Sequence, residues 1–171
     1  MQTDLPTVKP REFFRLPVVS HGAEFLVQGY LMRRNILTYK APPNNEGYDL
    51  LCIHPDPHKR MERQIRVQVK SRYASDGDRG FPVKEKTFTG FDFLIAVFLN
   101  IGSFNRKGDP KAGLRDPELY TFPLSFIRDN HNKQSSWEKV MTKGLDIKQY
   151  KNEEGFELIA QALDVPYPAK P

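Results

Sequence analysis

Residues 91–99 form a nearly continuous apolar run, FDFLIAVFL. Its length suits a single strand and is much too short to span a bilayer. A strand without regular polar alternation has no face suited to water, so packed layers must cover it on both sides. The run therefore predicts the central strand of a sheet, buried on both faces.

The segments around this run supply the other elements of a sheet domain. Apolar residues recur at helical spacing from His21 to Asn35, and Ser20 is the expected N-cap. Further strands are expected at 36–39, 48–53, 65–72 and 119–124, and a closing amphipathic helix at 156–163. This order predicts an α/β fold in which a central mixed β-sheet is flanked by helices.

The length of 171 residues indicates one domain with short appendages. We divide it into an N-terminal arm at 1–19, a core at 20–128 and a C-terminal extension at 129–171, whose short helix is expected to pack on the core. The single cysteine, Cys52, cannot form an internal disulfide and is expected in the core, and the N-terminal residues do not resemble a signal peptide. A cytoplasmic location is therefore the expectation.

Positive charge is concentrated in one segment. Residues 59–86 contain nine Lys or Arg and four acidic residues, a net of +5 that equals the net charge of the whole chain. A local positive field favours a polyanionic partner, because neutralising phosphates releases counterions. The segment therefore indicates nucleic acid, with a merely solvated basic loop as the alternative.

Three polar side chains share one face of the strand expected at 65–72. Alternate residues of a strand lie on the same face, which groups Arg66, Gln68 and Lys70. Asp49 begins the preceding strand, where an aspartate is poorly suited to a position before four apolar residues. If the two strands form a hairpin, Asp49 lies near Gln68 or Lys70. The alternative is an amphipathic strand with a wet polar face.

A carboxylate, an amide oxygen and an ammonium group at one end of a sheet suit the cleavage of phosphodiesters. A hard divalent cation takes oxygen ligands, and once bound it offsets phosphate charge and activates water. A lysine beside it can orient that water or stabilise developing charge. These groups therefore predict a metal-dependent phosphodiesterase site.

Asp49 followed by Gln68-Val69-Lys70 resembles the signature of the PD-(D/E)XK nucleases in its QxK variant. Glu24 resembles the additional acid that many of these enzymes carry on the first helix, and the expected order of elements matches their core over roughly residues 20–125. The chain is most similar to the single-domain types, such as homing endonucleases and Holliday-junction resolvases. The resemblance implies a restriction-endonuclease-like fold.

The resemblance also implies an endonuclease that depends on Mg²⁺ or Mn²⁺ and hydrolyses phosphodiester bonds of double-stranded DNA. Glu24, Asp49, Gln68 and the carbonyl of Val69 would hold the metal, and Lys70 would lie near the attacking water. Cleavage of both strands needs two active sites, so a homo-oligomer is expected. The residues expected to contact DNA are Lys59, Arg60, Arg63, Arg66, Arg72, Lys84 and Lys86.

Gln68 stands where these nucleases usually carry an acid, and this leaves alternatives open. A neutral amide weakens metal binding unless Glu24 points at the same site. The domain could instead be a catalytically decayed module for DNA binding or assembly, or a small domain unrelated to nucleic acid. His54 and His58 are expected to be loop residues that could touch phosphate, and His131 is not expected to bind metal, because the surrounding sequence of a ββα-metal site is missing. The aromatic residues expected to pack are Tyr73, Phe81, Phe88, Tyr120, Phe122 and Trp137.

Overall fold

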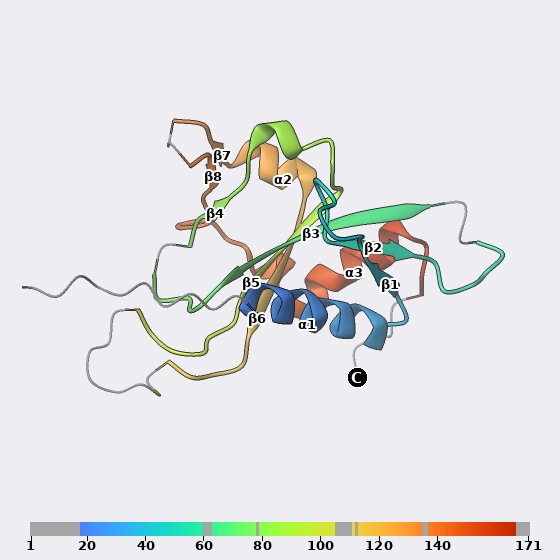
Figure 1. Ribbon diagram of the computed structural model, residues 1–171, viewed down its shortest axis with the longest axis horizontal. Coiled ribbons are helices and arrows are strands. Elements are labelled where there is room, and N and C mark those ends of the chain that lie inside the picture. The colour runs from blue at the N-terminus through green and yellow to red at the C-terminus, as the bar shows by residue number, and fades with distance from the viewer. Residues whose placement is uncertain are drawn as a thin grey trace, which may run out of the picture.

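A five-stranded mixed sheet forms the centre of the computed structural model, which describes residues 18–59, 63–77, 79–104, 111, 113–134 and 137–166 (Figure 1). The strand order is β1-β2-β3-β5-β6. β1, β2 and β3 are antiparallel neighbours, whereas β5 is parallel to β3 and antiparallel to β6. The bounds are Leu37–Lys40 for β1, Leu50–Ile53 for β2, Gln64–Arg72 for β3, Phe93–Phe98 for β5 and Glu118–Pro123 for β6.

β5 is the buried strand that the apolar run predicts. It lies between β3 and β6, and its residues from Leu94 to Phe98 are at most 1% exposed. Ile95 and Val97 enter one hydrophobic core, whereas Leu94, Ala96 and Phe98 enter a second. The sheet thus has a core on each face, which confirms the predicted α/β fold.

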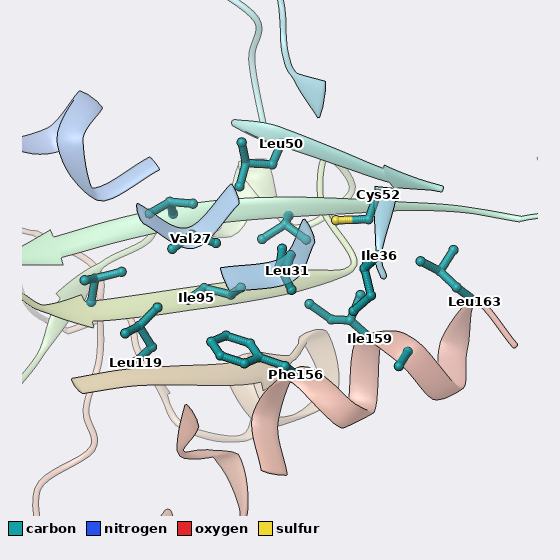
Figure 2. Close-up of a cluster of buried hydrophobic side chains, with 14 of the residues drawn as sticks. Val27, Leu31, Ile36, Leu50, Cys52, Ile95, Leu119, Phe156, Ile159 and Leu163 are labelled. Atoms are coloured by element: carbon teal, nitrogen blue, oxygen red, sulfur yellow. The ribbon is translucent and has the colours of Figure 1, made fainter. Parts of the chain in front are cut away.

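Two helices cover the first face. Val27 and Leu31 of α1 (Val19–Arg33) and Phe156 of α3 (Asn152–Ala162) pack toward Ile95 (Figure 2). The guanidinium of Arg34, just after α1, donates hydrogen bonds to the Glu153 carboxylate at the start of α3. Cys52 is fully buried in this core, as predicted.

A second, smaller sheet and a short helix cover the other face. α2 (Leu124–Asp129) follows β6 directly, and the 3₁₀ turns η1 (Glu85–Thr87) and η2 (Lys148–Tyr150) lie in the connections. The small sheet has the order β4-β8-β7 and was not predicted, because a strand of two residues has no hydrophobic period to recognise. Its strands are Phe81–Pro82 (β4), His131–Asn132 (β7) and Lys139–Val140 (β8).

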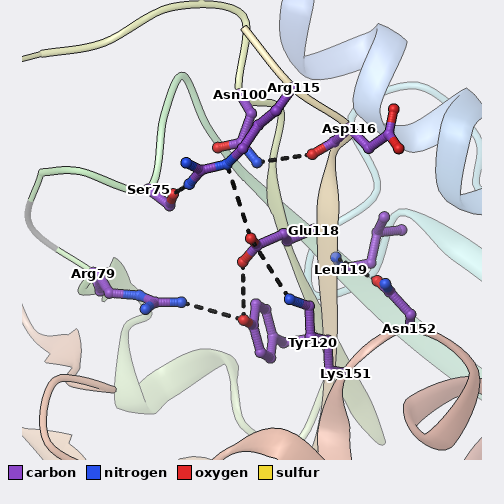
Figure 3. A network of polar contacts seen from close by, with 10 residues as sticks. All are labelled: Ser75, Arg79, Asn100, Arg115, Asp116, Glu118, Leu119, Tyr120, Lys151 and Asn152. Carbon is purple, nitrogen blue, oxygen red and sulfur yellow. Dashed lines mark hydrogen bonds and ion pairs between the residues drawn. The ribbon is translucent and has the colours of Figure 1, made fainter. Parts of the chain in front are cut away.

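A polar network holds the start of β6 against the segment that leads into α3 (Figure 3). The Glu118 carboxylate accepts a hydrogen bond from the Tyr120 hydroxyl at 3.0 Å and lies 3.6 Å from the Lys151 ammonium. Asn152 Oδ1 accepts a hydrogen bond from the Leu119 N–H at 3.0 Å. Arg79 also donates to the Tyr120 hydroxyl, at 3.3 Å, so the network reaches the loop after β3.

The ends of α1 show one correct and one wrong prediction. Asn35 follows the helix with φ 62°, the left-handed conformation expected of it. Ser20 is not the N-cap: the Gly22 N–H donates to the Val18 carbonyl at 2.8 Å, so the helix begins at Val19 and includes Ser20. The apolar period of the helix does not fix its first residue, which is why the cap was misplaced.

No helix within the ranges given above is both long and apolar enough to cross a membrane.

We expect Ile95→Ala to lower the free energy of unfolding by about 2–5 kcal/mol, because it leaves a cavity in a core that has no room to collapse. Ile101→Ala is the matched control: Ile101 is 40% exposed, whereas Ile95 is fully buried, so the control should change stability by no more than about 0.5 kcal/mol. Urea unfolding followed by circular dichroism measures both. Similar losses for the two variants would contradict the central position of β5.

Candidate active site

Asp49 lies at the point where β2 and β3 separate. Leu50, the first residue of β2, pairs with Val67, and the Asp49 N–H donates to the Val67 carbonyl at 2.9 Å. The Asp49 side chain then takes the place of the next backbone rung, because its Oδ2 accepts the Val69 N–H at 2.7 Å. We call this point of separation between β2 and β3 the fork, and the hydrogen bond fixes the Asp49 carboxylate at its opening. The two strands pair antiparallel, as the sequence predicts.

A close backbone contact positions the loop that leads to Asp49. Gly47 has φ 102°, and a Cβ placed on Gly90 would lie 2.7 Å from the Gly47 Cα. No side chain fits at this crossing without moving the backbone. Asn45 adds a hydrogen bond from its Nδ2 to the Tyr48 carbonyl at 2.8 Å. The loop before Asp49 therefore rests against the segment that precedes β5.

Glu24 points from α1 toward the same region. Its side chain is 15% exposed, and its carboxylate lies 2.6 Å from the Lys40 ammonium at the end of β1. Lys40 also lies over the Phe25 ring, 4.6 Å from its centroid. Glu24, Lys40 and Asp49 line one cavity of about 210 Å³. Two acids from a helix and a strand end thus face a shared space.

The electrostatics of Asp49 link the two halves of the site. Burial raises the pKa of the Asp49 carboxyl, and the negative charge of Glu24 raises it further. The Val69 N–H and the positive charges of Lys70 and Lys40 lower the pKa, but they do not cancel the effect of burial. Asp49 therefore lies within electrostatic reach of the helix acid and of the strand lysine.

Gln68 and Lys70 occupy the polar face of β3, as the alternation predicts. Extending the strand register by one residue places Gln68 opposite Asp49. The Gln68 Oε1 atom is buried, and it has no hydrogen-bond partner among the described residues. Gln68 and Lys70 line a second cavity, of about 480 Å³, together with Lys84. The acids and the Gln68–Lys70 pair thus line two cavities, with Asp49 at the fork between β2 and β3.

The oxygen atoms near the fork are divided between the two cavities, because the Glu24 and Asp49 carboxylates line one and the Gln68 amide lines the other. Carboxylates and an amide oxygen, here the Gln68 Oε1 that lacks a partner in the described part of the chain, are ligand types that Mg²⁺ and Mn²⁺ accept. In the part of the chain that the structure describes, no group of three or more His, Cys, Asp or Glu side chains offers a metal site. Val69 directs its side chain into the core and its N–H to Asp49, and the role of its carbonyl stays a prediction.

The basic segment is divided between two regions. Lys59 forms an ion pair with Asp164 at 3.7 Å, and Arg63 donates to the Ala162 carbonyl at 3.3 Å, so both lie beside the end of α3. Gln64 begins β3, six residues before Lys70, which corresponds to roughly 20 Å of extended strand. Lys59 and Arg63 therefore lie at the far end of β3 from Lys70. Arg60 lies outside the described residues.

Two other arginines of the basic segment are held by protein groups. Arg66 makes hydrogen bonds to both carboxylate oxygens of Asp92, at 3.1 and 2.9 Å, and to the Thr89 carbonyl at 2.8 Å. Arg72 donates to the Gly80 carbonyl at 3.1 Å and lies over the Phe81 ring. Lys84 and Lys86 remain beside the cavities around η1, and DNA contact by any of these residues stays a prediction.

Two residues of the site were not predicted from the sequence. Lys40 was missed, although the hairpin of β1 and β2 places it opposite Leu50 and therefore beside Asp49. Trp137 was expected to pack, and this was wrong, because it is 71% exposed at the rim of the Gln68–Lys70 cavity. Its position within a polar segment, without apolar neighbours at regular spacing, was the available signal.

The other aromatic predictions agree with the structure where it describes their packing. Phe81 and Phe88 are buried in the second core. His54 accepts the Asp56 N–H on its Nδ1, within the turn after β2, and His131 packs against Phe88 with its Nε2 2.8 Å from the Val83 carbonyl. These two imidazoles have structural contacts within the fold.

No protein-family model and no curated protein sequence matches this chain. Among solved structures, the bacterial homing endonuclease I-Ssp6803I is similar, with a TM-score of 0.51 and 16% sequence identity. The alignment covers 86% of this chain and 95% of the endonuclease chain. At this level of identity the likeness shows the fold alone, and it confirms the predicted nuclease-like architecture.

Asp49→Asn is expected to stabilise the protein at neutral pH. Because the pKa of Asp49 is raised, the folded protein binds this proton more tightly than the unfolded chain, and ionisation of the carboxyl costs stability as pH rises. The amide oxygen of Asn can still accept the Val69 N–H. We expect a higher urea midpoint than wild type at neutral pH in metal-free buffer, and a gain that disappears below about pH 4.

Asp116→Asn is the control for this measurement, because Asp116 is exposed and should show no such gain. A midpoint for Asp49→Asn that is unchanged or lower at neutral pH would contradict the unfavourable ionisation of Asp49.

Proposed function

We propose that the protein is a metal-dependent endonuclease of the PD-(D/E)XK type that hydrolyses phosphodiester bonds of DNA. The observation that carries the proposal is the fork itself: Asp49 is held at its mouth opposite Gln68, whose buried Oε1 has no partner among the described residues. A buried polar atom without a hydrogen bond is costly, and a cation would satisfy it. The likeness to a homing endonuclease supports the same reading.

Glu24, Asp49 and Gln68 would hold the cation, Mg²⁺ or Mn²⁺, with the Val69 carbonyl as an additional ligand. When bound, the cation supplies charge neutralisation at the phosphate and acidifies water. The raised pKa of Asp49 supports this role, because a nearby cation favours the ionised carboxyl that burial disfavours.

Lys70 would act on the phosphate and on the attacking water. No ion pair of Lys70 occurs within the described ranges, whereas Lys40 and Lys59 are both paired with acids. The Lys70 ammonium is therefore available to a ligand at the cavity that it lines with Gln68. There it would orient the water and stabilise the negative charge that develops on the phosphate.

DNA is the proposed substrate, with Lys84 and Lys86 as the backbone contacts that lie beside the site. Cutting both strands of a duplex needs two such sites, so the active species would be a homo-oligomer.

A nicking assay on supercoiled plasmid with Mg²⁺ or Mn²⁺ tests the proposal. Lys70→Ala should reduce cleavage by at least about 100-fold, because it removes the charge beside the water, and should leave DNA affinity within a few-fold of wild type. Lys148→Ala, an exposed lysine on η2, is the matched control and should cut like wild type. Equal cutting by wild type and Lys70→Ala would overturn the assignment of the site.

One observation favours a second function, a decayed nuclease domain that binds DNA without cutting it. The Lys40 ammonium lies 2.6 Å from the Glu24 carboxylate, where it occupies an oxygen that a cation would need. In an active enzyme Lys40 competes with the metal, so Lys40→Met should tighten Mn²⁺ binding in isothermal titration. Lys148→Met is the control and should leave the titration unchanged. A decayed site would bind no Mn²⁺ in either variant.

A further inference from the structure

The cavity next to Lys70 has features that hydrolysis of a phosphate does not use. Its volume, about 480 Å³, lies in the range of ligand pockets. Gln68 and Lys70 line it, and so do Pro82, Val83 and Trp137. The lining therefore combines two of the proposed catalytic groups with apolar side chains.

Trp137 is exposed, yet the backbone beside it is fixed. Its neighbour Glu138 has φ 32°, and its carbonyl accepts the Val83 N–H at 2.9 Å. The Glu138 carboxylate accepts the Glu85 N–H at 2.7 Å. A residue other than glycine in the left-handed region is held there by its surroundings. The indole, 71% exposed, is thus presented to solvent by an anchored backbone.

The charges and the indole at the cavity indicate the chemistry of its ligand. Lys70 and Lys84 place two positive charges on the cavity against the one negative charge of Glu138, a net positive charge that suits a phosphate, and Trp137 offers an aromatic face. In an intact duplex both faces of a base are covered by its neighbours in the stack. An indole can stack only on a base whose face is open, as in an unpaired nucleotide.

We infer that this cavity binds an unpaired nucleotide of the DNA beside the scissile phosphate, with its base stacked on Trp137 and its phosphate between Lys70 and Lys84. The inference rests on the proposed function for the position of the scissile phosphate. It names the substrate class as DNA with a locally unpaired nucleotide, such as a bulge, flap or branch point.

The test uses the full chain without divalent metal, so that it is independent of cleavage. Trp137 is the only tryptophan in the sequence, and its fluorescence therefore reports this cavity alone. The probes are two labelled DNAs of the same sequence, one a perfect duplex and one carrying a single bulged nucleotide. Tryptophan emission reports stacking, and anisotropy of the label gives the Kd.

The bulged DNA should quench Trp137 emission, protect it from acrylamide and bind about tenfold more tightly than the duplex, as one aromatic–base stack predicts. Trp137→Ala should abolish this preference, and Trp137→Phe should keep most of it. Phe104→Ala is the control, because Phe104 is 59% exposed but lines none of this cavity, and it should bind like wild type.

Saturated binding of the bulged DNA without a change in Trp137 emission would overturn the inference, and so would a preference that survives in Trp137→Ala. The proposed function fails separately. Cleavage of plasmid together with unaltered Trp137 emission would support the proposed nuclease function and contradict nucleotide binding at this cavity. Quenching and a bulge preference without any cleavage would support nucleotide binding at this cavity and contradict the nuclease function, in favour of a domain that only binds DNA.

Discussion

Burial of β5 on both faces determines where the other elements can lie. Because Ile95 and Val97 point to one core and Leu94, Ala96 and Phe98 to the other, each face of the sheet needs its own cover. α1 and α3 supply one, and α2 with the small sheet supplies the other (Figure 1). This arrangement brings Glu24 to the fork from the first layer and Trp137 to the rim from the second. Because β5 must be covered on both faces, residues from both covering layers lie beside the candidate site.

The same carboxylate serves the architecture and the proposed chemistry. β2 cannot continue past Asp49, because the chain turns at Gly47 to cross Gly90, and this leaves the Val69 N–H without a strand partner. Asp49 Oδ2 satisfies that N–H and is fixed by it. A hydrogen bond of this kind orients the carboxylate while its burial makes ionisation unfavourable. A carboxyl group that is held in a fixed position and whose ionisation is unfavourable is more typical of a functional site than of a structural core.

The sequence predicts those parts of the structure that depend on local patterns. The apolar run located β5, the alternation in 65–72 grouped Gln68 with Lys70, and the expected hairpin placed Asp49 near Gln68 or Lys70, a choice that the strand register decides for Gln68. What was missed depends on contacts between segments far apart in the chain. The small sheet pairs β4 with β8 across more than fifty residues, and neither strand has a pattern of its own. Trp137 was misjudged for the same reason, since its exposure depends on how that sheet is anchored.

Under the proposed function, charge balance explains why an amide rather than a third acid fits at position 68. Glu24 and Asp49 contribute two negative charges, and Lys40 and Lys70 contribute two positive ones, so the four groups are neutral without a ligand. A third carboxylate at position 68 would add an uncompensated buried charge, which is costly. The amide avoids that cost and keeps an oxygen at the same place. A divalent cation bound there would leave the site positive, and a positive site would attract the phosphate of DNA. Under the proposed function, metal and DNA would therefore favour each other's binding, and displacement of Lys40 from Glu24 would be the step that admits the cation.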